Sequence, residues 1–355
     1  MSRLTDANDP QPLCRAARRA VVTGGAGFIG SHLVEILLAE GIEVLVVDDL
    51  STGSRANLAP AMARSRRSGV NCELEVASCA EPATAARAVA GADIVFHLAG
   101  IVGVRKLARQ PLDVMQANLH STQAMLAAAA AGSVPILITS SSEVYGDGPV
   151  PFVENTPVQP GATEGLRGGY ACAKAMGEWL AMAHRVDSNL PVLVARLFNT
   201  VGPRQSGSDG MVLPRFVRQA LHGEPLTVYG EGRQTRCFAH VRDIARALFE
   251  LSRSSCVPGP VVNVGSDIET SVGDLAQLVC EVAGSGSELR TVPFHEIFPP
   301  GFLDPPRRVP DLERLRTAIG WVPSTSLADI VRDQVAWARA SMAAAVRPSA
   351  AADAS

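Results

Sequence analysis

The chain has 355 residues, with 35 acidic and 32 basic side chains and a formal net charge of −3. This balance, without a clustered Lys/Arg face, argues against a nucleic-acid partner. No apolar run approaches the roughly 18–20 residues that span a bilayer, which argues against a membrane protein. The seven cysteines show no metal-binding spacing and suit reduced thiols, so we expect a cytoplasmic protein without a bound metal.

The N-terminal part of the chain predicts a leader followed by a strand, a tight turn and a helix. Residues 1–18 lack the apolar core of a secretory signal, and we expect them to be a disordered leader. An apolar run at 20–23 ends in glycines, and apolar residues then recur at helical spacing over 28–40. Residues 42–47 form a second β-branched strand, with Asp48 at its carboxyl end.

The same alternation of apolar strands and amphipathic helices continues to about residue 200. We expect a weak strand at 74–76, a helix at 83–89, a strand at 94–98, a helix at 114–131, a strand at 135–138, a helix at 170–184 and a strand at 192–196. Continuous apolar strands between helices indicate a parallel sheet covered on both faces. The fold class is therefore α/β, a doubly wound (Rossmann) sheet over residues 19–200.

The pattern loosens over residues 201–342, where proline and glycine are frequent. Short strands at 226–229 and 261–264, and helices at 213–221, 241–252 and 272–283, predict a smaller mixed α/β domain. We expect this domain to bind substrate over the carboxyl edge of the sheet, with one strand or helix returning to the sheet. Residues 343–355 are small and polar and predict a disordered tail.

Three glycines, Gly24, Gly27 and Gly30, lie between the first predicted strand and helix. Glycine allows close approach of the backbone to a pyrophosphate, and the helix N-terminus offers free N–H groups. Asp48, 18 residues beyond Gly30, is placed to accept the adenosine ribose hydroxyls and to repel a 2′-phosphate, which favours NAD over NADP. Arg55 is close in sequence and leaves NADP as the alternative cofactor. For the glycine turn, the alternative interpretation is that it only packs the helix against the strand.

Tyr170 and Lys174 form a second group of candidate residues. They are four residues apart and therefore lie on one face of a helix. Lowering a phenol pKa from near 10 to about 7 takes roughly 4 kcal/mol, which a neighbouring ammonium and a positive nicotinamide ring can supply. The hydroxyl run at 139–142 follows a predicted strand at the ligand-binding edge of the sheet. A surface Tyr/Lys pair and a plain polar loop are the alternatives.

From Val21 to about Trp337 the chain resembles the extended short-chain dehydrogenase/reductases that modify nucleotide sugars with bound NAD. The motifs that carry the resemblance are VTGGAGFIGSHL (22–33), VVDDLSTG (46–53), FHLAG (96–100), SSSEVYG (140–146), YACAK (170–174), RLFNTVGPR (196–204), LTVYGEGRQTR (226–236) and RRVPD (307–311). The family's usual acid after the third strand, which meets the adenine amine, is replaced here by residues 76–79, where Ser78 can hydrogen-bond.

The resemblance implies that Tyr170 is the base on the sugar 4-hydroxyl, that Lys174 also holds the nicotinamide ribose, and that Ser141 and Glu143 complete the catalytic group. The implied cofactor-binding residues, beside Tyr170 and Lys174, are Gly24, Gly27, Phe28, Ile29, Gly30, Asp48, Asp49, Ser51, Thr52, Gly53, Leu98, Ala99, Gly100 and Asn118. The implied substrate-binding residues are Ser142, Asn199, Arg204, Val212, Arg215, Val228, Tyr229, Arg236 and Arg308. Within that set, Asn199, Arg236 and Arg308 would meet the diphosphate and Tyr229 the base.

The second step of the reaction separates the members of this family. A 4,6-dehydratase needs an Asp-Glu pair where this chain has Ser142-Glu143, whereas Ser-Ser-Glu fits UDP-glucuronate decarboxylases and GDP-mannose dehydratases. Residues 97–104 and the Tyr170-Ala171 dipeptide look more like a 4-epimerase.

We therefore expect a UDP-sugar 4-epimerase acting through a 4-keto intermediate, on UDP-glucuronate (interconverted with UDP-galacturonate) or UDP-glucose. Arg105 and Arg204 are cations that suggest a uronate, and Arg204 would restrain its carboxylate. A decarboxylase that forms UDP-xylose is the alternative, and a non-catalytic NAD-binding regulator is a third hypothesis. The resemblance also implies a homodimer formed through the helices around Asn118 and Tyr170.

Overall fold

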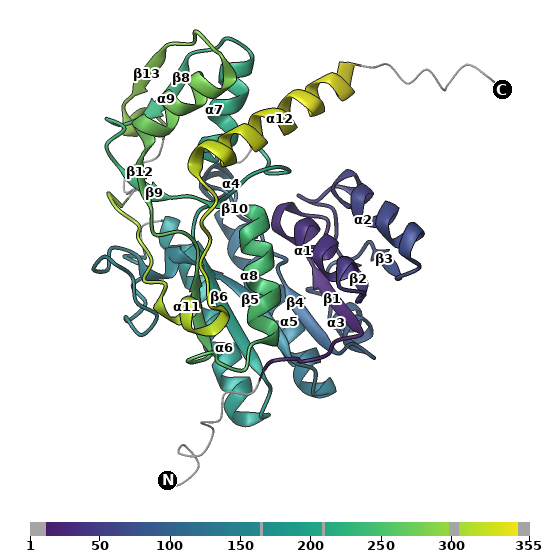
Figure 1. Ribbon diagram of the computed structural model, residues 1–355. Helices are drawn as coiled ribbons and strands as arrows, with labels where there is room; N and C mark the ends of the chain where they lie inside the picture. The colour runs from purple at the N-terminus through teal and green to yellow at the C-terminus, as the bar shows by residue number, and fades with distance from the viewer. Residues whose placement is uncertain (1–11, 164–165, 208–209, 298–304, 347–355) are drawn as a thin grey trace, which may run out of the picture.

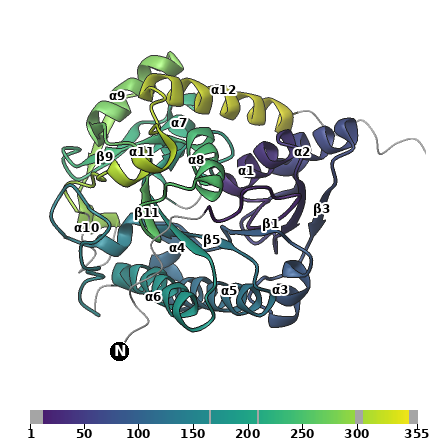
Figure 2. The same ribbon diagram turned by 60° about the horizontal axis from the view of Figure 1, so that its bottom comes forward.

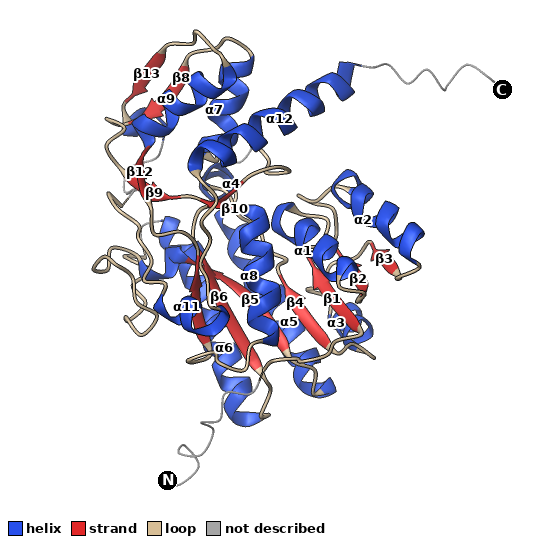
Figure 3. Ribbon diagram, in the orientation of Figure 1, coloured by secondary structure: helices blue, strands red, loops and turns tan. Residues whose placement is uncertain are grey.

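A seven-stranded parallel sheet forms the centre of the molecule (Figures 1 and 3). The computed structural model describes residues 12–163, 166–207, 210–297 and 305–346. The strands in sheet order are β3 (Cys72–Glu75), β2 (Glu43–Val47), β1 (Arg19–Thr23), β4 (Ile94–His97), β5 (Ile136–Ser141), β6 (Val192–Leu197) and β11 (Val261–Val264). The order reverses between β1 and β4, where a doubly wound sheet binds its ligands. The predicted fold class is confirmed.

Helices cover both faces of the sheet, as Figure 2 shows. One face carries α1 (Phe28–Ala39), α2 (Arg55–Ser68), α8 (Val241–Arg253) and α11 (Glu313–Ile319). The other carries α3 (Pro82–Val89), α5 (Pro111–Gly132) and α6 (Leu166–Asp187). Each layer has its own apolar core against the sheet, which explains why the strand sequences are apolar throughout rather than alternating.

A smaller lobe lies over the carboxyl edge of the sheet, at the top of Figure 1. It contains α7 (Val212–Leu221), β8 (Leu226–Tyr229), β9 (Thr235–Cys237), β12 (Glu269–Ser271), α9 (Val272–Ala283), β13 (Leu289–Val292) and α12 (Leu327–Val346). Its core packs α7, α9 and α12 together. Strand β11, from the same half of the chain, pairs in parallel with β6, so this half of the chain returns to the sheet.

The remaining described elements are short. They are α4 (Val104–Arg109), the 3-10 turn η1 (Ser142–Tyr145), β7 (Thr200–Val201), β10 (Ala239–His240) and α10 (Phe294–Ile297). Among the described residues, no helix combines the length and the apolar character that a bilayer crossing requires.

The predicted bounds of the N-terminal leader and of the C-terminal tail need correction. Within the expected leader, the Cys14 N–H donates to the Ser252 carbonyl at 2.8 Å, and Leu13 and Ala17 pack against the core, so residues 12–18 are part of the fold. Helix α12 continues to Val346, past the expected start of the tail at 343. Residues 1–11 and 347–355 lie outside the described part of the chain.

Candidate active site

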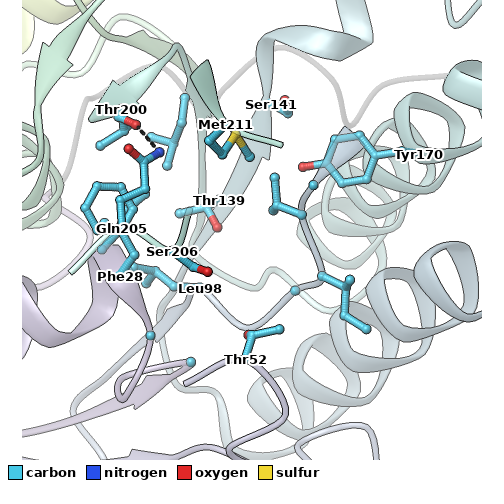
Figure 4. A pocket seen from close by; sticks show the side chains of 18 of the residues that line it. Phe28, Thr52, Leu98, Thr139, Ser141, Tyr170, Thr200, Gln205, Ser206 and Met211 are labelled. Carbon is cyan, nitrogen blue, oxygen red and sulfur yellow. Dashed lines mark hydrogen bonds between the residues drawn. The ribbon is translucent and has the colours of Figure 1, made fainter. Parts of the chain in front are cut away.

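A cavity of about 630 Å³ lies between the carboxyl edge of the sheet and the smaller lobe. Its lining comes from the turn after β1, from the ends of β2, β4, β5 and β6, from the start of α6 and from α7 and β8. Figure 4 shows Tyr170 and Ser141 at one end of it, and Phe28, Thr52 and Leu98 further along. Sequence segments far apart thus meet at one edge of the sheet.

The glycine turn has the tight geometry that the sequence predicts. Gly24 has φ +69°, and a Cβ there would lie 2.8 Å from the Ala99 backbone nitrogen. A Cβ on Gly30 would lie 2.2 Å from the Gly24 carbonyl oxygen. Gly27 precedes α1 without a side-chain cap, so the first amides of this 12-residue helix are available to an anion. The cradle fits a pyrophosphate and leaves no room for side chains.

Replacing Gly30 by Ala is therefore expected to remove bound NAD, because the added methyl group forces the turn away from α1. NAD released from acid-denatured protein measures the effect. Gly286→Ala is the matched control, since nothing lies within 4 Å of its added Cβ and its φ is ordinary. A Gly30→Ala protein that retains stoichiometric NAD would contradict the assigned role of the turn.

Asp48 is buried at the end of β2 and already accepts two backbone hydrogen bonds. Its Oδ2 accepts from the Ala26 N–H at 2.9 Å and its Oδ1 from the Leu50 N–H at 2.9 Å. Burial raises the pKa of the Asp48 carboxyl, and these two bonds oppose the rise. A carboxylate has about four acceptor sites, so capacity remains for ribose hydroxyls. Exposed Arg55 starts α2 and is not among the described residues that line the cavity, which favours NAD.

The other predicted cofactor residues follow the wall of the cavity. Those that line it are Phe28, Ile29, Asp49, Ser51, Thr52, Leu98, Ala99 and Gly100. Gly53 lies behind Asp48, where a Cβ would be 2.8 Å from Oδ1. Ser78 lines the cavity, and its hydroxyl accepts from the Ala80 N–H at 3.3 Å, so a hydroxyl stands where the family's acid is missing.

Helix α6 brings Tyr170 and Lys174 to the end of β5, and both side chains are buried. Burial raises the pKa of Tyr170, the nearby Glu143 carboxylate adds to this rise, and a hydrogen bond with Ser141 opposes it. The Lys174 ammonium donates to the Thr139 carbonyl oxygen at 3.1 Å. Burial lowers the pKa of Lys174 to about 8, against an opposing effect of Glu178. Without further positive charge the phenol stays protonated, so it becomes a base only when a cationic ring enters the cavity.

Three buried side-chain amides carry an atom without a hydrogen-bond partner among the described residues: Asn118 Oδ1, Asn199 Nδ2 and Gln205 Oε1. Asn199 and Gln205 line the cavity, and Asn118 lies behind its lining residue Gly100. Asn118 donates to the carbonyls of Ile101 and Val114, and its Oδ1 points toward Gly100, whose added Cβ would lie 2.6 Å from it. Buried polar atoms of this kind normally have partners, and a nucleotide or sugar provides them. The residues present thus fit NAD and a nucleotide sugar.

Sequence reasoning missed Gln205, because a glutamine next to the Arg204 of the motif carries no signal of its own. Its side chain is buried at the cavity wall, where the Nε2 donates to the Thr200 carbonyl at 3.1 Å. Figure 4 shows it beside Phe28. The position of Gln205 in the cavity lining follows only from the tertiary structure.

Arg308 lines the cavity, as the sequence predicts for a substrate-binding residue, and it also contacts the loop after β5. Its Nη2 donates to Glu143 Oε2 at 2.9 Å and its Nη1 to Ser142 Oγ at 3.4 Å, so the guanidinium packs against the catalytic loop after β5. These contacts bring the guanidinium to the reacting end of the cavity, and its predicted pairing with a diphosphate stays a prediction. Arg236, which lines the cavity and donates to the Thr235 carbonyl, stays the candidate for the diphosphate.

Of two other predicted substrate residues, Arg204 lines the cavity, whereas Val228 does not belong to its described lining. Arg204 donates to Ser31 Oγ at 3.1 Å and forms an ion pair with the Glu35 carboxylate of α1, so its contacts do not support a restraint on a sugar carboxylate. Val228 is 3% exposed and packs in the core of the lobe, because alternate residues of β8 face opposite sides.

Its neighbour Tyr229 faces the cavity, and the Arg215 guanidinium lies 3.8 Å from the Tyr229 ring centroid. This pair offers a flat cationic and aromatic surface suited to a nucleobase. Val212, at the start of α7, lines the same wall. The side chain of Arg105 lies outside the described residues.

The chain matches known proteins over most of its length. The model of the NAD-dependent epimerase/dehydratase family matches residues 20–265. A UDP-N-acetyl-α-D-glucosaminuronate decarboxylase from Bacillus cytotoxicus is 35% identical over 91% of this chain and 98% of that protein. UDP-glucuronic acid decarboxylase 2 from Arabidopsis thaliana is 37% identical over 90% of this chain and 67% of that protein.

Solved structures of epimerases share the fold. The UDP-glucose 4-epimerase of Thermus thermophilus, in complex with NAD, superposes with a TM-score of 0.78 at 29% identity, covering 90% of this chain and 99% of that one. The family match, the relatives and the shared fold agree with the glycine turn and the Tyr-Lys spacing. The chain therefore belongs to the NAD-dependent epimerase/dehydratase family of nucleotide-sugar enzymes.

Proposed function

We propose that this protein is an NAD-dependent UDP-hexuronate decarboxylase that acts through a 4-keto intermediate. The observation that carries the proposal is the contact of buried Arg308 with Glu143 at the end of the cavity where Tyr170 and Ser141 lie. The curated relatives named above are decarboxylases of UDP-uronates, which supports the same choice. This reverses the order favoured by the sequence, in which the 4-epimerase came first.

The first step needs a base on the sugar 4-hydroxyl. Tyr170 takes this proton as a phenolate, and Ser141 shares the hydrogen bond. The Lys174 ammonium and the cationic nicotinamide ring would together favour the phenolate. The glycine turn and Asp48 would hold NAD, which would supply the acceptor for the C4 hydride and the hydride that is returned at the end. The chain's own residues orient the hydroxyl and hold its proton.

The second step is loss of CO₂ from the 4-ketone, which is a β-keto acid. The electron pair of the C5–C6 bond moves into an enolate at C5–C4, whose oxygen faces the hydroxyls of Tyr170 and Ser141. The Glu143 carboxylate repels the substrate carboxylate and so favours its departure as neutral CO₂. Arg308 orients Glu143 through its ion pair. C5 then takes a proton from water, and the C4 ketone takes back the hydride together with the proton held by Tyr170, which restores the alcohol.

The second candidate is the 4-epimerase, favoured by the segment 97–104 and by the solved epimerases that share the fold. A uronate epimerase must pin the carboxylate of its 4-keto intermediate against decarboxylation. Arg204, the predicted restraint, is instead committed to Glu35. An epimerase on this scaffold would therefore be expected to act on a neutral sugar such as UDP-glucose. A 4,6-dehydratase still lacks its aspartate, and the assembled Tyr170, Lys174 and Ser141 argue against a non-catalytic regulator.

Incubation of the purified protein with UDP-glucuronate, followed by separation of the products, tests the proposal. We expect a UDP-pentose together with one equivalent of CO₂. UDP-galacturonate without CO₂ would establish the epimerase instead. The N-acetylated uronate of the Bacillus cytotoxicus relative is the second substrate to supply. Turnover of UDP-glucose, with neither uronate consumed, would refute the decarboxylase.

We also propose a homodimer formed through α5 and α6, which pack side by side on one face of the sheet (Figure 2). Large apolar side chains are exposed on these helices, including Trp179 at 59% and Leu112 at 60% exposure. Exposed residues of this kind are typical of interfaces between subunits. Light scattering is expected to give twice the chain mass, and Trp179→Glu to give the monomer. A monomeric wild-type protein would contradict the proposal.

A further inference from the structure

A buried ion pair lies beneath the reacting residues. Glu178 of α6 accepts from Arg196 of β6 at both carboxylate oxygens, with Nη2 to Oε2 at 2.7 Å and Nε to Oε1 at 3.0 Å. The Ser140 hydroxyl donates to Glu178 Oε1 at 2.5 Å. Ser140 and Arg196 are paired with each other in the β5–β6 ladder. One carboxylate therefore binds both members of a cross-strand pair at the end of the sheet.

The same face of α6 carries the catalytic residues. Tyr170, Lys174 and Glu178 follow one another at intervals of four residues, so their side chains form one row. Tyr170 hydrogen-bonds with Ser141, and Lys174 with the Thr139 carbonyl. Glu178 binds Ser140, which lies between Thr139 and Ser141 in the strand. Three successive turns of α6 therefore contact three consecutive residues of β5. A shift of α6 along the strand would break all three contacts together.

The ion pair does not contact ligand. Glu178 and Arg196 are 5% and 4% exposed, and neither belongs to the described lining of the cavity, although Ser140 does. Arg196 is otherwise satisfied by the Glu154 carbonyl at 3.1 Å and by the Tyr145 ring, 4.7 Å from its guanidinium carbon. Buried ion pairs add little net stability compared with apolar packing, whereas they can specify one arrangement over others.

We propose that Glu178 is a positioning residue for the reaction, which with Arg196 and Ser140 fixes α6 on the ends of β5 and β6 and supplies the negative charge that balances the Lys174 ammonium. The proposal rests on the first step, oxidation at C4, which both candidate functions share. Glu178 would not touch the sugar or the nicotinamide, and it would act through Lys174 and through the position of the helix.

The charged and polar groups around Lys174 support this role. From α5 it faces the Asn118 amide, since Asn118 Oδ1 and Lys174 Nζ both lie within 3.5 Å of a Cβ added to Gly100. From β5 it meets the Thr139 carbonyl. His97 of β4 is buried and neutral, since burial and Lys174 lower its pKa to about 3. Glu178 is the acid that raises the pKa of Lys174 against the effect of burial.

Glu178→Gln retains the size of the side chain and its contact with Ser140, but it removes the charge. We expect the upper limb of the kcat–pH profile to move down by about one pH unit, because Lys174 then loses its proton more readily. At pH 9 and above, reduction of bound NAD is expected to fall about tenfold, with a smaller change below pH 7. Stopped-flow absorbance of the reduced nicotinamide measures this first step directly.

Glu250→Gln is the matched control, since Glu250 forms an i,i+4 ion pair with Arg246 on the surface. It is expected to leave the pH profile unchanged. If Glu178→Gln does not fold, Arg196→Lys replaces it: this variant retains the charge, and we expect a lower kcat with an unshifted pH limb. A wild-type pH profile in a folded Glu178→Gln, or a wild-type kcat in Arg196→Lys, would overturn the proposal.

The test is independent of which sugar is the substrate. It uses whichever UDP-sugar reduces the NAD bound to the wild-type protein, so an incorrect proposed function changes the substrate and leaves the comparison of variants intact. If the role proposed for Glu178 is incorrect, the variants will instead behave as the wild-type protein does.

Discussion

Tyr170→Phe is expected to lower turnover by roughly 10³-fold while NAD stays bound, because the phenylalanine ring retains the packing and loses the base. The phenol lies against Ser141 at the end of the cavity, where a proton must leave the sugar 4-hydroxyl before a hydride can leave C4. Product formation from UDP-glucuronate and NAD released from denatured protein measure the two properties separately.

Tyr145→Phe provides the control for this change. The Tyr145 hydroxyl donates to Asn263 Oδ1 at 2.7 Å in the core, and Tyr145 is not among the described residues that line the cavity. We expect it to cost about 1 kcal/mol of unfolding free energy and to leave turnover within a factor of about two. If Tyr170→Phe retained more than about a tenth of the wild-type turnover, the assignment of the base would be wrong.

Arg308→Gln is expected to slow CO₂ release by roughly 10²-fold and to leave the reduction of bound NAD nearly unchanged. The substitution removes the positive charge that pairs with the Glu143 carboxylate at the reacting end of the cavity, so the carboxylate is no longer held in the orientation that favours loss of CO₂. Because the Glu143 carboxylate faces the sugar carboxylate in the second step, reduced nicotinamide should accumulate. Labelled CO₂ and nicotinamide absorbance, followed in one reaction, report the two steps.

Arg307→Gln is the matched control, because the neighbouring arginine forms its ion pair with Glu269 at the surface. It should leave both steps unchanged. The two roles considered for Arg308 give different kinetics. A phosphate ligand, as the sequence predicts, would raise the KM of the nucleotide sugar and leave kcat intact, and that result would refute the place of Arg308 in the second step.

The regular elements were predictable where the apolar pattern is continuous. The bounds of β8, β11 and α9 are those expected from the sequence. In each of these short segments the apolar residues follow a clear strand or helix pattern. Helix α2 was missed, since it carries Pro60 in its interior and several arginines, and only Leu58 and Ala61 of the helix are buried. A helix with so narrow an apolar face is stabilised by its packing against α1, which periodicity does not record.

The local chemistry of the site is likewise determined by the sequence. The glycine turn and the Tyr170-Lys174 pair depend on spacings of three and four residues within one turn or one helix, and such geometry follows from the backbone alone. The positions of Asp48 and Ser141 at strand ends follow from the order of strands and helices, because the carboxyl ends of parallel strands meet at one edge.

The partners of the long cationic side chains were decided only by the tertiary structure. Arg308 meets Glu143 from 165 residues away, and Arg204 meets Ser31 from 173 residues away. Each arginine has a flexible stem that can reach a phosphate, a carboxylate or a neighbouring loop. Which of these it meets depends on how the smaller lobe packs over the sheet, and that packing sums many weak apolar contacts that no short motif contains.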